Sequence, residues 1–161
     1  MRVANYVKMA TIMTRKETLN DESNPDPGLL DALVPVVFVT TAILNKVGAE
    51  NDLSLTLIRV LGILWDRRPR MAELADYLGL EKQTMSGLVA RAEARGLVAR
   101  APNGLDGRAT DVFLTKEGAK LVKRLRLQIQ QAMTPLTEQL SASDQLLLRD
   151  LLHRMLDNPR T

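Results

Sequence analysis

Apolar side chains recur along this chain mostly at helical spacing, after a start that is polar. Residues 14–28 end in Asn-Pro-Asp-Pro-Gly, a composition that favours disorder or a loop over a packed core. The stretch 29–47 is apolar over about 19 residues, which favours a helix, although its β-branched residues favour a strand. Pro35 is expected to kink or begin that helix, and Gly48 is expected to end it.

The middle of the chain predicts three helices followed by a β-ribbon. Ser54 is a suitable N-cap for the first helix, Gly79-Leu80 a turn between the second and third, and Gly96 a stop for the third. A glycine-rich loop, Asn103 to Arg108, separates two short β-prone runs. The expected elements are helices over 55–66, 71–78 and 82–95, and strands over 97–101 and 110–114.

Two more helices are expected after the ribbon. Thr115 is a natural N-cap for the first, which Pro135 should end or bend. Ser141 with Asp144 resembles a capping box that opens a leucine-rich last helix. The predicted fold class is therefore mainly α with a small β-ribbon, an α+β arrangement in which a helix-turn-helix precedes the ribbon.

Composition limits the domain count and the chemistry. The chain has 161 residues with 45% apolar content, enough for one core, so we expect a leader over 1–27 and one domain over 28–161. It has no cysteine, which excludes disulfides and thiolate metal sites and fits a reducing cytoplasm. No apolar run approaches the roughly 20 residues that span a bilayer, so no membrane partner is expected.

Positive charge is concentrated in the middle of the chain. Residues 53–126 contain 14 Lys/Arg and 8 Asp/Glu, a net charge of +6, whereas the remainder carries −3. This part is the one expected to meet a polyanion, and a solvated basic face is the alternative.

The third predicted helix separates an apolar face from a polar one. Leu74, Leu78, Met85, Leu88 and Val89 are expected to form one buried face of the helix-turn-helix. Short polar side chains at a helix N-terminus can contact base edges and phosphates, although any surface helix shows a polar outer face. The outward residues, which are the candidate DNA contacts, are Lys82, Gln83, Thr84, Ser86, Gly87 and Arg91.

The loop between the predicted strands offers a further candidate contact. Asp106 and Arg108 are two residues apart, so on an extended backbone the carboxylate can hold the guanidinium in one orientation. An oriented arginine at a loop tip suits a narrow minor groove. The alternative is a hairpin tip with an incidental ion pair.

With these residues in place, the chain resembles the multiple-antibiotic-resistance regulator (MarR) family of winged helix-turn-helix transcriptional regulators over roughly residues 29–157. Asp106-Gly107-Arg108 followed by Leu114-Thr115 is similar to the wing pattern of the family. Supporting matches are Glu73-Leu74-Ala75, Leu78-Gly79-Leu80, Thr84 and Arg95-Gly96-Leu97-Val98-Ala99-Arg100.

The resemblance implies how the parts would work. Residues 53–116 would be the DNA-binding part, while helices over 28–50 and 117–157 would form a homodimer on a roughly palindromic double-stranded operator. Arg108 would enter the minor groove, with Asp106 as its orienting partner. Gly87 departs from the longer polar residue common in the family and offers no side-chain contact. The alternative for the apolar flanking helices is a larger intramolecular core.

The resemblance also implies a small lipophilic or aromatic effector that would release a repressor from DNA. Phe38, Trp65 and Met71 could line its pocket, although ordinary core packing is the competing interpretation. No cofactor is expected, and His153, the only histidine, is too few ligands for a metal site.

Catalysis is not expected, because the chain lacks a phosphate-binding glycine loop and a nucleophile partnered with its histidine. The alternative function is a winged helix that binds another protein or RNA without ligand control.

Overall fold

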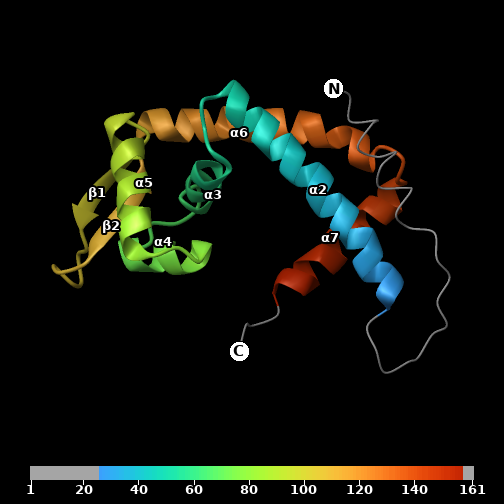
Figure 1. Cartoon of the computed structure of the whole chain (residues 1–161), viewed down its shortest axis with the longest axis horizontal. Helices are drawn as coiled ribbons and strands as arrows, with labels where there is room; N and C mark the ends of the chain where they lie inside the picture. The colour runs from blue at the N-terminus through green and yellow to red at the C-terminus, as the bar shows by residue number, and fades with distance from the viewer. Residues whose placement is uncertain (1–25, 158–161) are drawn as a thin grey trace. The chain divides into compact units, whose positions relative to one another are not determined.

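The computed structural model describes residues 26–157, which form six helices and a two-stranded antiparallel sheet (Figure 1). The mainly α fold with a small β-ribbon is thereby confirmed, while almost all of the predicted leader lies outside the described residues. The elements are α2 (Pro27–Glu50), α3 (Leu55–Ile63), α4 (Met71–Leu78), α5 (Lys82–Ala94), β1 (Val98–Pro102), β2 (Thr110–Leu114), α6 (Lys116–Thr137) and α7 (Ala142–Leu156).

The chain divides into two compact units, and each is described by itself. The central unit is Thr41–Ile129, which holds α3, α4, α5, the sheet and the adjoining ends of α2 and α6. The flanking unit consists, within the described residues, of 26–40 and 130–157, which include α7. The prediction of one domain over 28–161 stays a prediction.

The core of the central unit is built around the crossing of α4 and α5. All five residues predicted for this face are buried, and Leu74, Met85 and Val89 are fully so. Ala75 is small enough for close packing and is also buried. Gly79 ends α4 in the left-handed conformation, with φ of 64°, which lets the chain turn directly into α5.

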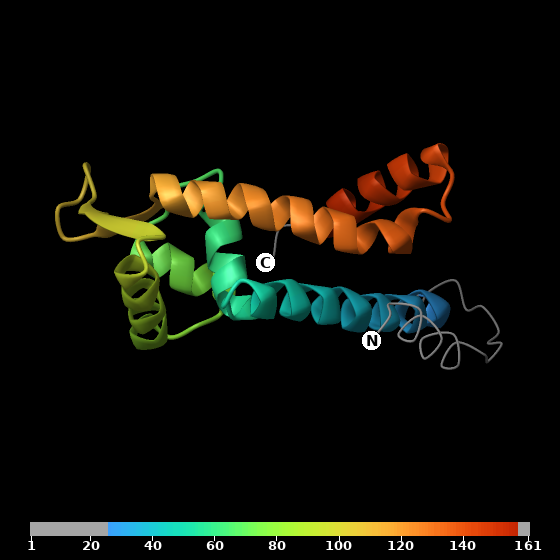
Figure 2. The same ribbon diagram turned by 90° about the horizontal axis from the view of Figure 1, so that it is seen from above.

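The sheet is a short antiparallel ribbon that we call the wing (residues 98–114). Its register pairs Val98 with Leu114 and Pro102 with Thr110. Figure 2 shows the loop between the strands extending past the helices of the central unit. The wing is tied to α6 by Thr115, whose Oγ1 accepts a hydrogen bond from the Gly118 N–H at 3.0 Å, so the predicted N-cap is confirmed.

Several predicted helix ends are wrong. Gly48 does not end α2, which continues to Glu50. A Cβ at Gly48 would lie 2.6 Å from the Leu53 carbonyl oxygen, so this glycine permits a close backbone approach inside the helix. Pro35, which was expected to kink or begin this helix, lies inside α2, so only the second alternative is excluded. The predicted 55–66 helix ends earlier, at Ile63.

Pro135 does not end α6, which runs on to Thr137. Proline removes one backbone donor from a helix, and such a loss is cheapest on an exposed surface where water can reach the freed carbonyl. Pro135 and Gln131, which supplies that carbonyl, are both exposed.

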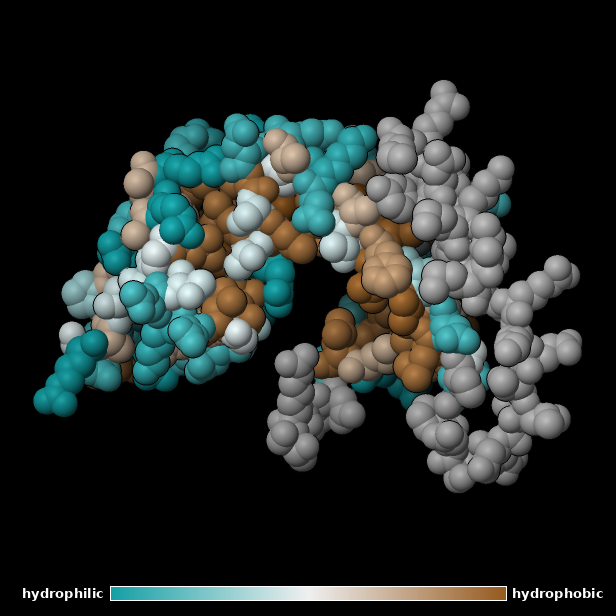
Figure 3. Space-filling model, viewed as in Figure 1, coloured by the Kyte–Doolittle hydropathy of each residue, from teal (hydrophilic) through white to brown (hydrophobic). Residues whose placement is uncertain are grey.

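The flanking unit leaves much of its apolar surface uncovered. Helix α7 begins at Ser141, whose Oγ accepts from the Asp144 N–H at 3.2 Å as predicted, but no residue of α7 is buried. Figure 3 shows apolar side chains gathered over α7. The exposed apolar residues of this unit include Leu29, Leu30, Val34, Val36, Val37 and Phe38 of α2, and Leu146, Leu147, Leu148, Leu151, Leu152, Met155 and Leu156 of α7.

Helix α2 overturns the expectation about membrane-spanning length. Among the described residues there is one helix, Gly28–Glu50, that is long enough and apolar enough to cross a membrane. Its mean hydropathy is 1.8 over 18 residues. The expectation that no run approaches that length is wrong. The criterion is one of length and composition only, and core helices of globular proteins also meet it.

Gly118 gives a direct test of the contact between α6 and Leu97, the residue that precedes the wing. An added Cβ would lie 1.9 Å from the Leu97 carbonyl oxygen, so Gly118→Ala must displace backbone. We expect this variant to lose about 1–3 kcal/mol of unfolding free energy, measured by urea titration. The matched control is Gly62→Ala in α3, where nothing lies within 4 Å of the added methyl and the helix gains about 0.5–1 kcal/mol. Equal stability of the two variants would contradict the packing described.

Candidate nucleic-acid interface

Helix α5 presents a polar face because its apolar face is buried. Met85, Leu88, Val89 and Ala92 fix that buried face, and they leave the other side of the helix to solvent. The N-cap Glu81 makes no side-chain capping hydrogen bond, so it does not occupy the N–H groups of the first turn. The predicted contacts that lie exposed on α5 are Lys82, Gln83, Thr84, Ser86 and Arg91.

Gly87 lies half-buried on the same helix. The nearest group to a Cβ built there is the Arg91 guanidinium, with Nη1 at 3.5 Å, which is an ordinary contact distance. The Arg91 side chain therefore passes close to the position where Gly87 lacks a side chain of its own.

The wing tip differs from the predicted arrangement of Asp106 and Arg108. The Asp106 Oδ1 accepts a hydrogen bond from the backbone N–H of Arg108 at 3.0 Å. Among residues 26–157, no ion pair joins the Asp106 carboxylate to the Arg108 guanidinium. The prediction that Asp106 holds the guanidinium directly is thus wrong, because the tip is a tight turn and not an extended strand, and its carboxylate caps the turn. The Arg108 side chain is exposed.

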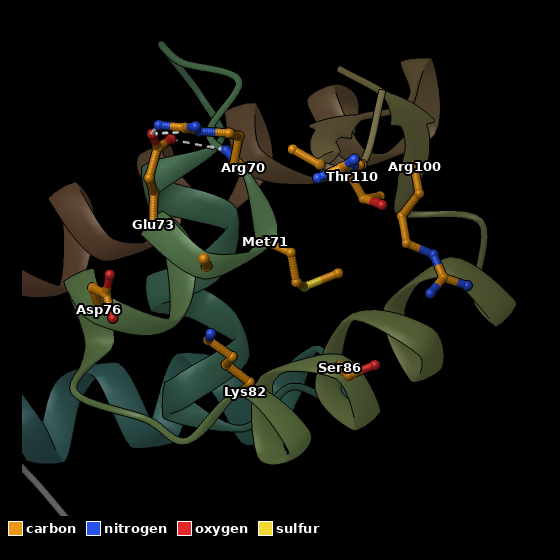
Figure 4. Close-up of a pocket in the computed structure, with 11 residues that line it drawn as sticks. Arg70, Met71, Glu73, Asp76, Lys82, Ser86, Arg100 and Thr110 are labelled. Atoms are coloured by element: carbon orange, nitrogen blue, oxygen red, sulfur yellow. Dashed lines mark hydrogen bonds and ion pairs between the residues drawn. The ribbon is translucent and has the colours of Figure 1, made fainter. Parts of the chain in front are cut away.

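A cavity of about 570 Å³ opens between α4, α5 and the wing (Figure 4). Lys82 and Ser86 of α5 and Arg108 of the wing, all predicted contacts, share its wall. In the close-up, Lys82 reaches from α5 toward α4, and Met71 extends from the first turn of α4 into the same space. The remaining lining residues are Arg70, Ala72, Glu73, Asp76, Arg100, Ala109 and Thr110.

Arg70 is held in place on the wall of this cavity by Glu73. The Glu73 carboxylate accepts from the Arg70 backbone N–H at 2.9 Å and from the Arg70 Nε at 2.8 Å. The backbone hydrogen bond, followed by the bond to the guanidinium, holds the pKa of Glu73 below its usual range. The same pair raises the pKa of Arg70. Glu73 therefore stays a carboxylate and Arg70 a cation at neutral pH.

Arg70 and Arg100 were missed by the sequence reasoning. Arg70 lies in the dense basic run Arg67-Arg68-Pro69-Arg70, between the first two helices predicted for the middle of the chain. Arg100 lies on β1, where its guanidinium pairs with Glu93 of α5. Tertiary packing brings both side chains to the cavity. In the sequence, the high local density of positive charge was the one signal that could have identified them.

The predicted effector residues do not share the described cavity. Met71 lines it, whereas Trp65 is absent from its wall and stacks with the Arg126 guanidinium, 5.5 Å from the ring centroid. Phe38 belongs to the flanking unit, where it is exposed. Within residues 26–157, no group of three or more His, Cys, Asp or Glu side chains is placed to hold a metal ion.

A helix-turn-helix with an exposed second helix, followed by a protruding two-stranded wing, defines the winged helix-turn-helix class of proteins. Residues 51–109 match the sequence profile of the MarR family. This match agrees with the predicted resemblance to the MarR family over these residues, and the relatives of the chain are transcriptional regulators rather than enzymes.

Among its relatives is the HTH-type transcriptional regulator TtmR of Methylorubrum extorquens, 30% identical over 115 residues. That match covers 66% of this chain and 58% of TtmR, so the chain spans less than two thirds of its curated relative. The fold is shared with apo MarR from E. coli, with a TM-score of 0.69, 24% identity and coverage of 88% of this chain and 99% of MarR. CouR from Rhodococcus jostii, bound to p-coumaroyl-CoA, has a TM-score of 0.67 at 21% identity, with coverage of 83% and 94%.

Gly87 allows the outward face of α5 to be tested without DNA. Because a methyl group fits beside Arg91, we expect Gly87→Ala to fold normally and to gain about 0.5–1 kcal/mol of unfolding free energy from helix propensity. Thermal unfolding monitored by circular dichroism measures this gain. A loss of stability would mean that α5 is more crowded at this position than the structure indicates.

Proposed function

We propose that this chain is a dimeric, sequence-specific DNA-binding regulator that represses nearby genes and is released by a small-molecule effector. The observation that carries the proposal is the placement of predicted contacts from two separate elements, α5 and the wing, around one basic cavity. A helix that enters the major groove beside a wing that enters the adjacent minor groove needs this juxtaposition.

The charge of the cavity supports a polyanionic partner. Four cationic side chains, those of Arg70, Lys82, Arg100 and Arg108, line it with two carboxylates. Glu73 is engaged by Arg70, and Arg100 is paired with Glu93, so Lys82 and Arg108 are the cations best placed to contact phosphate or base edges. The N–H groups at the start of α5 add a further attraction for phosphate.

Dimer formation is supported by the apolar surface of the flanking unit. A helix with a leucine-rich surface and no buried residue is costly to leave in water. A second copy of the chain would cover this surface on α2 and α7, and it would bring two winged helices to a two-fold symmetric operator. The cytoplasmic location that we propose follows from this role.

Release by an effector is supported by similarity alone. CouR, whose structure contains p-coumaroyl-CoA, shares the fold of this chain. A small lipophilic or aromatic molecule is the class of effector that we propose. Phe38, Trp65 and Met71 remain predictions for its site, and Met71 is the one that lines the described cavity.

The proposed role of Arg108 can be tested on duplex DNA selected by the protein from a random pool. Arg108→Ala should weaken binding to the selected duplex by about 1–3 kcal/mol, measured by fluorescence anisotropy, because it removes the exposed wing cation. Binding of the unmodified protein should also fall steeply as salt rises.

The matched control is Lys46→Ala, which removes one exposed positive charge from α2 in the same unit. This variant should retain nearly all of its affinity. If both variants lose similar affinity, Arg108 contributes only through the net charge of the protein and the wing assignment is wrong. If no salt-sensitive duplex binding is seen at all, the protein-interaction or RNA-binding alternative is favoured.

The dimer is tested by placing a charge on α7. Leu147 is 59% exposed in the single chain, so Leu147→Glu should leave the monomer folded but halve the mass seen by sedimentation equilibrium. Leu105→Glu, at a fully exposed leucine of the wing tip, is the control and should leave the mass unchanged. A Leu147→Glu variant that remains a dimer would show that α7 is not the interface.

A further inference from the structure

We propose that Asp111 of β2 is a positioning residue, which sets the conformation of the wing tip, and therefore the place of Arg108, through Asn103. Its consequence for DNA reading rests on the function proposed above, whereas its effect on the tip does not. Neither Asp111 nor Asn103 was a candidate from the sequence.

Asp111 is anchored on one side to the segment between α3 and α4. Its side chain is 13% exposed, and its Oδ2 lies 3.6 Å from the Arg68 Nε. The Arg68 guanidinium also stacks on Phe113 at 3.9 Å from the ring centroid. Next to this pair, the Val112 N–H donates to the Pro69 carbonyl at 3.0 Å. The base of the wing is thus held to the body of the central unit by side-chain and backbone contacts.

On its other side, Asp111 holds Asn103, where the tip begins. The Asn103 Nδ2 donates to the Asp111 Oδ1 at 2.7 Å. This bond fixes the Asn103 amide, whose Oδ1 accepts from the backbone N–H groups of Leu105 and Asp106, both at 3.0 Å. A series of hydrogen bonds therefore runs from Asp111, which is paired with Arg68, through Asn103 into the turn.

The same series reaches Arg108. The Asp106 Oδ1 accepts from the Arg108 N–H at 3.0 Å, and the Asp106 carbonyl accepts from the Ala109 N–H at 2.9 Å. The Asn103 N–H closes the turn by donating to the Ala109 carbonyl at 2.9 Å.

Packing does not hold the tip. Residues 104–108 are all exposed, Leu105 completely so, and two of the five are glycines with nothing within 4 Å of an added Cβ. Such a segment keeps one conformation only through its hydrogen bonds, so loss of the pair at its base should release it. A contact group that is already ordered binds at a lower entropic cost.

The pair of Asn103 and Asp111 can be broken and then restored with its orientation reversed. Asn103→Asp places a carboxylate against the carboxylate of Asp111 and removes the bond between them. Adding Asp111→Asn restores a donor and an acceptor, because the introduced amide at position 111 can donate to the introduced carboxylate at position 103. The double variant has the net charge of the unmodified protein, so it separates the hydrogen bond from any change in charge.

The first measurement uses no DNA. We expect ¹⁵N relaxation order parameters of the Leu105, Asp106 and Arg108 amides to be about 0.8 in the unmodified protein, below about 0.6 in Asn103→Asp, and back near 0.8 in the double variant. Unchanged order in Asn103→Asp, or no recovery in the double variant, would overturn the proposal. If Asn103→Asp fails to fold, Asn103→Ala replaces it, with Asp111→Ala as its partner, and equal loss of tip order in both is then the expected result.

The second measurement is affinity for the duplex selected by the unmodified protein. Asn103→Asp should weaken binding about tenfold, the double variant should regain it to within about twofold, and Asn103→Asp should add little to Arg108→Ala if it acts through that residue. If tip order follows the pair but affinity does not, Asp111 does not position Arg108 for DNA. If the unmodified protein binds no duplex, the proposed function fails, while the order parameters still decide whether Asp111 orders the tip.

Discussion

The burial of one face of α5 against α4 is the constraint on which the rest of the central unit depends. Met85 and Val89 are fully buried together with Leu74, and this packing determines which side of α5 reaches solvent. Gln83, Thr84 and Ser86 are exposed for that reason alone, since they alternate with the buried positions at helical spacing. The tight turn at Gly79 brings α4 and α5 into this contact. As a result, the polar residues of α5 lie together on one exposed face, which is suited to recognition.

The wing depends on a different kind of interaction. Its base packs on the central unit through Arg68, Phe113 and the Val112 backbone, whereas its tip is held by a series of short-range hydrogen bonds. Asp106 caps the turn, and within residues 26–157 no carboxylate forms an ion pair with the Arg108 guanidinium. The ordered backbone of the turn determines where the long, exposed Arg108 side chain starts. Its charge therefore stays available to a polyanion.

Sequence reasoning predicted the elements well where one local signal dominated. Ser54, Thr115 and Ser141 are helix caps as expected, because a hydroxyl that accepts a backbone N–H is a local interaction. It was wrong at Gly48, where a local rule predicted a helix end, and Pro135, which was expected to end or bend α6, does not end it. Gly48 serves a close approach of Leu53, and Pro135 lies on an exposed face, and neither circumstance can be recognised from neighbouring residues alone.

The sequence by itself determined the class of this protein: the spacing of buried and polar residues in α4 and α5, the turn at Gly79 and the wing motif at Asp106 to Arg108 are all encoded within short segments. Only the tertiary structure decided which charges meet. Arg70, Arg100 and Arg108 come from different segments and line one cavity, and Asp111 reaches Asn103 across the paired strands. Such contacts depend on register and on packing between helices, which are set by the summed burial of the whole core and not by any local pattern.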